Sequence, residues 1–146
     1  MGVFERLVIP DLVAGELQRY AVDVTQLDIP DLIFSVVPVA TEEWEAVMYG
    51  QEAPAIQPAD VQVFVLAQAN QLQHPVLTDD LALRQYLESH HGVVVGSVGV
   101  LVRAYRVGLF QRRELEEAID SLFDYSTLHL SRAFRAYVSR LLPNLP

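Results

Sequence analysis

The chain has 146 residues, of which 51% are apolar and 20% are charged, a composition typical of one globular domain rather than of a disordered protein. It contains no cysteine, which excludes disulfide bonds, thiolate metal sites and a cysteine nucleophile, so any metal would be held by oxygen or imidazole. The net charge of −9 argues against a protein that coats nucleic acid electrostatically.

Charge is distributed unevenly along the chain. Residues 1–83 hold two arginines and thirteen acids, a net charge of −11, whereas residues 84–146 hold eight arginines and six acids, a net charge of +2. The carboxylates and the guanidinium groups therefore come from different parts of the chain. The sequence has no run of about 18 uncharged apolar residues and no export signal. We therefore expect a soluble, cytoplasmic protein that does not contact a membrane.

The first part of the chain predicts alternating strands and helices. Residues 7–9 are apolar and suit a strand, and the Pro10-Asp11 pair that follows favours the first turn of a helix. Residues 32–37 form a β-branched and aromatic run that suits a buried strand. The expected elements are a strand at 7–9, a helix at 10–20, a strand at 32–37, a helix from 41 and a loop at 50–57.

The rest of the chain continues this alternation and ends in helices. The strongest helical pattern begins at Pro58, with Val61, Phe64 and Val65 at i, i+3 and i+4. The expected elements are a helix at 58–72, a strand at 75–78, a helix at 81–90, a strand at 93–95, and helices at 97–107, 111–123 and 130–142. Wholly apolar strands separated by helices indicate a small parallel sheet flanked by helices. We therefore expect a single α/β domain over residues 1–146.

Several acids follow or precede the predicted strands. In open parallel α/β sheets, ligands bind beyond the carboxyl ends of the strands, which is where Asp79 and Asp80 fall. Asp60 begins the helix that leads to this strand, and Glu16 lies in the helix after the first strand. Carboxylates gathered at one edge repel one another unless a hard cation such as Mg²⁺ or Mn²⁺ neutralises them. The pattern therefore predicts a metal site at this edge.

A simpler interpretation also fits each of these residues. An aspartate at the start of a helix satisfies free amide groups and favours the helix dipole, which would account for Asp60 and for one of the Asp79-Asp80 pair. Glu16 alone would be a solvated helix residue. His90 and His91 would be a helix terminus rather than metal ligands, because adjacent residues on a helix point in different directions.

Four stretches of the chain, taken in order, resemble a known family. The most specific features are the aspartate pair followed by Arg84, and Ser97 between two glycines at a strand-to-helix turn. The stretches are residues 8–17, 59–67, 77–84 and 95–101. Together they resemble the PIN-domain family, and within it the predicted nucleic-acid-binding proteins related to the toxin nucleases of bacterial and archaeal toxin–antitoxin pairs. The resemblance implies a three-layer PIN-like fold.

The resemblance also implies an activity, which is cleavage of single-stranded RNA that depends on Mg²⁺ or Mn²⁺ and on a quartet of acids. Glu16 matches the acid in the helix after the family's second strand, and Asp60 matches the acid at the head of the long helix. Asp79 matches the acid after the next strand, and Asp80 shares that role. We therefore expect Glu16, Asp60 and Asp79 to be catalytic, and all four acids to be metal ligands.

Nucleic-acid contacts and partners are expected from the same comparison. Ser97 matches a small hydroxyl residue at the edge of the site, and we expect it to contact the nucleic acid together with Arg84 and Arg103. Arginines on helix faces are, as an alternative, simply solvated. Members of the family commonly dimerise, so we expect a homodimer, and the resemblance implies an antitoxin partner.

The start of the chain departs from the family pattern. Family members begin with a strand that ends in an aspartate, followed by a helix, before the segment that residues 7–16 match. Only six residues precede that segment here, so we expect an N-terminally truncated PIN-like domain that lacks one acidic ligand. The leading hypothesis is a toxin-type ribonuclease impaired by this loss. The alternatives are a non-catalytic PIN-like remnant that acts as a binding or dimerisation module, and an unrelated α/β protein whose acids only cap helices.

Overall fold

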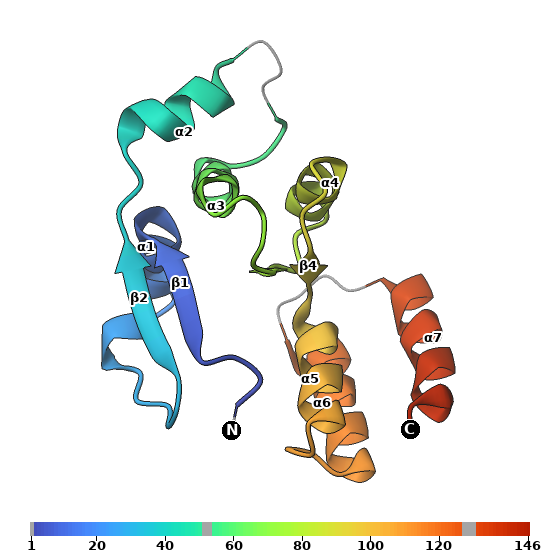
Figure 1. Cartoon of the computed structure of the whole chain (residues 1–146). Helices are drawn as coiled ribbons and strands as arrows, with labels where there is room; N and C mark the ends of the chain where they lie inside the picture. The colour runs from blue at the N-terminus through green and yellow to red at the C-terminus, as the bar shows by residue number, and fades with distance from the viewer. Residues whose placement is uncertain (1, 51–53, 127–130) are drawn as a thin grey trace. The chain divides into compact units, whose positions relative to one another are not determined.

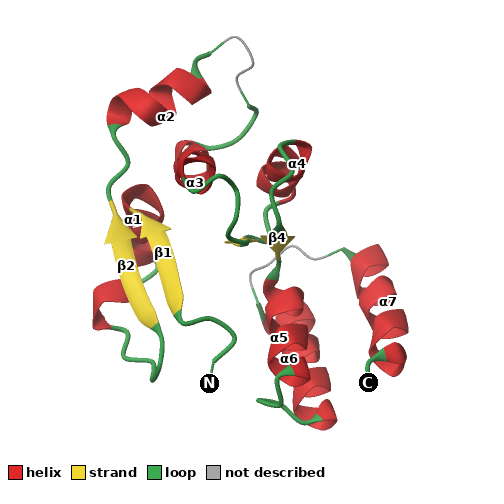
Figure 2. Cartoon of the chain, in the orientation of Figure 1, coloured by secondary structure: helices red, strands yellow, loops and turns green. Residues whose placement is uncertain are grey.

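The computed structural model describes residues 2–50, 54–126 and 131–146, and the chain divides into two compact units, Met1–Val95 and Gly96–Pro146 (Figure 1). The first unit contains strands and helices, and the described part of the second unit consists of helices (Figure 2). All the strand pairs are parallel within the described residues. This content confirms the predicted α/β class.

The first unit begins with a strand–helix–strand segment, as the sequence predicts. Its elements are β1 (Arg6–Pro10), α1 (Asp11–Arg19), the 3-10 turn η1 (Val24–Gln26) and β2 (Ile33–Val37). In the parallel register of β1 and β2, Leu7 lies opposite Phe34, and both suit a pleated, half-buried surface. Pro10 is the last residue of β1 and the N-cap of α1. Because proline has no N–H to donate to a ladder, the strand ends there and the helix follows at once.

A second strand–helix–strand segment follows later in the first unit. Its elements are β3 (Val76–Leu77), α4 (Leu81–Ser89) and β4 (Val94–Val95). The ladder extends one residue beyond β3, because the N–H of Thr78 donates to the carbonyl of Val95 at 3.1 Å. The sequence predicts one small sheet, whereas the described strands form two separate pairs, β1-β2 and β3-β4. Apolar patterning identifies a strand but does not specify its partner, which is a long-range choice.

The core of the first unit lies between α4 and the helix that precedes β3. The two helices between β2 and β3 are α2 (Thr41–Met48) and α3 (Pro58–Ala69). Phe64 of α3 and Leu83 and Leu87 of α4 form a buried cluster in which each side chain is at most 2% exposed. Burial of a side chain of this size stabilises the fold by about 1.5–3 kcal/mol. These contacts hold α3 against α4, and part of the loop predicted at 50–57 lies outside the described residues.

Left-handed residues end two helices of the first unit. The helix predicted to reach Leu72 ends instead at Ala69, because Gln71 and Leu72 have φ values of 57° and 55°, which no α-helix accommodates. The stop predicted for α4 is confirmed: His90 is its C-cap, and His91 has a φ of 65°. Local periodicity alone did not reveal the first of these turns, since Gln71 and Leu72 are ordinary helix formers.

The second unit contains three helices in its described residues. They are α5 (Ser97–Arg106), α6 (Arg112–Tyr125) and α7 (Arg132–Leu141), followed by the 3-10 turn η2 (Leu142–Asn144). Leu115 and Ile119 of α6 pack with Val138 of α7 in a cluster in which each side chain is at most 3% exposed. Gly108 ends α5 with a φ of 81°, a conformation that glycine adopts without steric cost. The predicted order of helices is confirmed.

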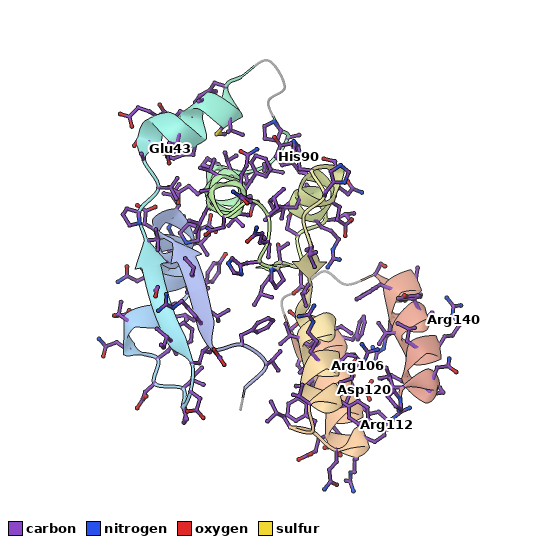
Figure 3. The ribbon with its side chains drawn as sticks, in the orientation of Figure 1. Glu43, His90, Arg106, Arg112, Asp120 and Arg140 are labelled. Atoms are coloured by element: carbon purple, nitrogen blue, oxygen red, sulfur yellow. The ribbon has the colours of Figure 1, made fainter. Side chains whose placement is uncertain are left out.

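Ion pairs and caps reinforce these helices. Arg135 of α7 bonds Asp124 of α6 at 2.6 Å and lies 3.6 Å from Asp120, which Figure 3 labels on α6. The helix predicted at 130–142 begins at Arg132, since the hydroxyl of Ser131 accepts the N–H of Phe134 and caps it. Residue 130 lies outside the described residues. Among the described residues, no helix is both long and apolar enough to cross a membrane.

Candidate metal centre

Glu16 lies on α1, the helix that follows β1 directly. The strand ends at Pro10, so Glu16 falls in the second turn of the helix and within a few residues of the strand's carboxyl end. Its side chain is exposed. The local sequence therefore places one carboxylate on the helix that follows the carboxyl end of β1.

Asp60 lies in the first turn of α3 and is half-buried. The backbone N–H of Gln57, the N-cap residue, donates to the Asp60 carboxylate, so Asp60 does cap its own helix. Burial nevertheless raises the pKa of Asp60, and the negative charges of Asp80 and then Glu16 raise it further, against the lowering effect of the Gln57 N–H. The Asp60 carboxylate therefore caps its helix and is also subject to burial and to the charges of two other acids.

Asp79 and Asp80 form the turn between β3 and α4. The hydroxyl of Thr78 accepts the N–H of Asp80 at 3.1 Å, which fixes the backbone of the turn. The Oδ1 atom of Asp80 accepts the N–H of Leu83 at 2.7 Å, so Asp80 is the N-cap of α4. Asp79 is half-buried and Asp80 is exposed. The capping interpretation is thus correct for Asp80, which also acts electrostatically on Asp60.

Three of the acids named from the sequence interact although they lie on separate elements. The charges of Asp80, in the turn before α4, and of Glu16, on α1, both act on Asp60 of α3. In this turn, Asp80 is a Coulombic partner of Asp60. Within the parts of the chain that the structure describes, no three His, Cys, Asp or Glu side chains are close enough to hold a metal ion.

The chemistry of this donor set nevertheless suits a hard cation. Mg²⁺ prefers oxygen ligands, keeps several of its waters and is usually held by only one or two carboxylates. Burial raises the pKa of Asp60, and the charges of Asp80 and Glu16 raise it further; a bound cation would relieve this repulsion. The carboxylates of Glu16, Asp60 and Asp80 therefore fit Mg²⁺ or Mn²⁺ in ligand type and in charge.

A buried amide beside these acids was missed by sequence reasoning. Gln62 of α3 is 2% exposed, and its Oε1 atom accepts the N–H of Leu12 in the first turn of α1 at 3.1 Å. The available signal was a polar residue inside an apolar run, Val61-Gln62-Val63-Phe64. A side chain of this kind is usually buried only when it is hydrogen-bonded.

The residues expected to contact nucleic acid lie in both units. Arg84 is half-buried on α4 of the first unit, 3.7 Å from Glu88 in an i, i+4 ion pair. Ser97 is the first residue of α5 and Arg103 is exposed on the same helix, so both belong to the second unit. The first unit thus contains the four predicted acids and Arg84.

A family model described as DUF3368, PIN domain, matches residues 2–143, which include both units. No curated protein and no solved structure matches the chain significantly.

Proposed function

We propose that this chain, which belongs to the PIN-domain family, is a ribonuclease that depends on Mg²⁺ or Mn²⁺. Membership of the PIN-domain family points to a nuclease, and we propose in addition that it is a ribonuclease of the toxin type. One observation carries it: the carboxylates of Glu16 on α1 and of Asp80 in the turn before α4 both act electrostatically on the half-buried Asp60 of α3. Perturbed carboxyl groups of this kind cluster at functional sites.

The metal would be held by Glu16, Asp60, Asp79 and Asp80, directly or through water. A bound divalent cation would activate water and stabilise the charge that builds on a phosphate. The chain's own residues hold the ligands in place: the N–H of Gln57 orients Asp60, and the hydroxyl of Thr78 fixes the turn that carries the aspartates. Glu16, Asp60 and Asp79 are the proposed catalytic acids.

The proposed substrate is single-stranded RNA. Arg84, Ser97 and Arg103 are the proposed contacts to it, since guanidinium groups pair well with phosphate oxygens. The match to the family model extends over residues 2–143, which supports treating residues 1–146 as a single PIN-like domain. A cytoplasmic location, a homodimer and an antitoxin partner follow from the resemblance to toxin nucleases and belong to the same proposal.

A second candidate function is a non-catalytic binding or dimerisation module. The observation that favours it is that, among the described side chains, no group of three potential ligands is already gathered for a metal. The same acids also serve as helix caps, which gives them a structural role without a metal. The two candidates differ in whether a cation binds at Asp60.

Manganese titration followed by RNA cleavage tests the choice. We expect Mn²⁺, monitored by electron paramagnetic resonance, to bind the protein, and Asp60→Asn to abolish most of this binding. We expect cleavage of a fluorogenic single-stranded RNA to fall by about a hundredfold or more in Asp60→Asn and Asp79→Asn, the scale of a lost catalytic group. The matched control is Asp120→Asn, an exposed acid on α6.

Two results would decide against the nuclease. Absence of Mn²⁺ binding at millimolar concentration would favour the binding module, and equal cleavage rates for the native chain and Asp60→Asn would place any activity elsewhere. Equal loss of activity in Asp120→Asn would point to a general folding defect.

A further inference from the structure

Gln62 is a polar side chain in an apolar environment. Among the described residues, Gln62 is the one polar or charged residue that is buried, with 2% of its surface exposed. Its neighbours Val61 and Phe64 are buried as well. An amide in such surroundings is stable only when its polar atoms have hydrogen-bond partners. No buried side-chain nitrogen or oxygen in the described residues lacks one. The buried polar atoms of Gln62 therefore have hydrogen-bond partners within the folded chain.

The bond from Gln62 spans two helices that carry proposed ligands. Its Oε1 atom accepts the N–H of Leu12 at 3.1 Å, and Leu12 lies in the first turn of α1. This N–H is one of the orphan donors of a helix start. The N-cap residue of α1, Pro10, makes no side-chain cap, and the carboxylate of Asp11 shares the N–H of Leu12 at 3.0 Å. Gln62 thus completes the cap of α1 from another helix.

The position of this bond relates it to the acids. Glu16 follows Leu12 by one turn of α1, so the two residues lie on the same side of that helix. Asp60 precedes Gln62 by about half a turn at the start of α3. Because each helix is stiff over this length, the bond from Gln62 to Leu12 contributes to the separation of Glu16 and Asp60. The charge of Glu16 does reach Asp60.

We infer that Gln62 is a positioning residue, which fixes the spacing between the carboxylates of Glu16 and Asp60 by holding the first turn of α1 against α3. For its role in metal binding the inference rests on the proposed function. Groups that support metal ligands through hydrogen bonds usually orient those ligands, and removing such a group weakens metal affinity by about ten- to a hundredfold. Gln62 would act on the ligands through the backbone of two helices and not by touching the cation.

The test uses spin labels, since the chain contains no native cysteine that would react with them. Cysteines introduced as Gln18→Cys on α1 and Gln68→Cys on α3, both exposed positions, report the distance between the helices by double electron–electron resonance. Gln62→Met keeps the length and burial of the side chain and removes the acceptor. Gln62→Glu keeps an acceptor oxygen. Gln85→Met, the same exchange at an exposed site on α4, is the matched control.

We expect a narrow distance distribution for the native residue, for Gln62→Glu and for Gln85→Met, and a broadened one for Gln62→Met. In the unlabelled chain, we expect Gln62→Met to weaken Mn²⁺ binding about tenfold or more and Gln85→Met to leave it unchanged. Far-UV circular dichroism confirms that each variant keeps its helices, so that a loss of affinity is not a loss of fold.

The outcomes separate this inference from the proposed function. An unchanged distance distribution in Gln62→Met overturns the inference, and so does native Mn²⁺ affinity in that variant. If the native chain binds no Mn²⁺, the proposed function fails, and the distance distribution alone then decides whether Gln62 sets the spacing. Broadening supports the inference in that case, and no broadening overturns it.

Discussion

Asp60, in the first turn of α3, lies within electrostatic reach of Asp80, the N-cap of α4: burial raises the pKa of Asp60, and the negative charge of Asp80 raises it further. Each of the two residues also accepts a backbone N–H at the start of its own helix. Each carboxylate therefore stabilises the start of its own helix, while the repulsion between the two negative charges destabilises the folded chain. This combination is typical of sites where function is retained at the expense of stability, and it leads to predictions that do not depend on a metal.

Asp60→Asn should stabilise the metal-free protein at neutral pH. The pKa of Asp60 is raised in the folded chain, so its contribution to stability is greatest below the unfolded pKa and is lost as pH rises through the folded pKa. The side chain is only half-buried, so solvent screening limits the gain to less than about 1 kcal/mol. Urea unfolding in EDTA at pH 4 and pH 7 measures it, and a gain at pH 4 that exceeded the gain at pH 7 would contradict the sign.

Asp80→Ala and Asp80→Asn should differ in stability, because only alanine removes the cap of α4. The Oδ1 atom of Asp80 accepts the N–H of Leu83, and asparagine offers an equivalent oxygen. We expect Asp80→Ala to be less stable than Asp80→Asn by about 1 kcal/mol in urea unfolding. Ser131→Ala at the start of α7 is the matched control for a lost cap. Equal stability of the two Asp80 variants would mean that the cap contributes nothing.

Phe64→Ala should strongly destabilise the first unit. The ring is 2% exposed and lies edge-on to Tyr86, with centroids 4.7 Å apart. Truncation of a buried aromatic ring leaves a cavity and costs about 3–5 kcal/mol. Phe64→Leu fills most of the space, so we expect a smaller loss in thermal and urea unfolding. A loss for Phe64→Ala no larger than that for Phe64→Leu would show that the surroundings collapse into the cavity.

Arg135→Gln should raise the pKa of Asp124 towards its ordinary value. The hydrogen bond from Arg135 lowers the pKa of Asp124. Since this pKa is depressed in the folded chain, the stabilisation is present above the unfolded pKa and lost as pH falls through the folded pKa. Carboxyl NMR titration measures the change, with Arg132→Gln, an exposed arginine of the same helix, as control. An unaltered Asp124 titration in Arg135→Gln would contradict the assignment.

Most of the secondary structure could be predicted because its signals are local. Pro10 and Pro58 mark helix starts, Gly108 marks a helix end, and apolar runs mark the strands. The exception is the end of α3, where Gln71 and Leu72 adopt left-handed conformations that their residue types do not predict. The candidate acids were also identified from sequence, because acids at helix starts and after strands follow a short-range pattern.

Local sequence signals were enough to predict the order of strands and helices, the positions of the candidate acids along the chain and the resemblance to the PIN-domain family. The packed chain was needed to show that the strands pair as β1-β2 and β3-β4, that Asp80 in the turn after β3 acts on Asp60, and that Gln62 is bonded to Leu12. Periodicity and caps act over a few residues, whereas pairing, burial and charge coupling join residues far apart in the chain. Those relationships exist only once α1, α3 and α4 are packed together.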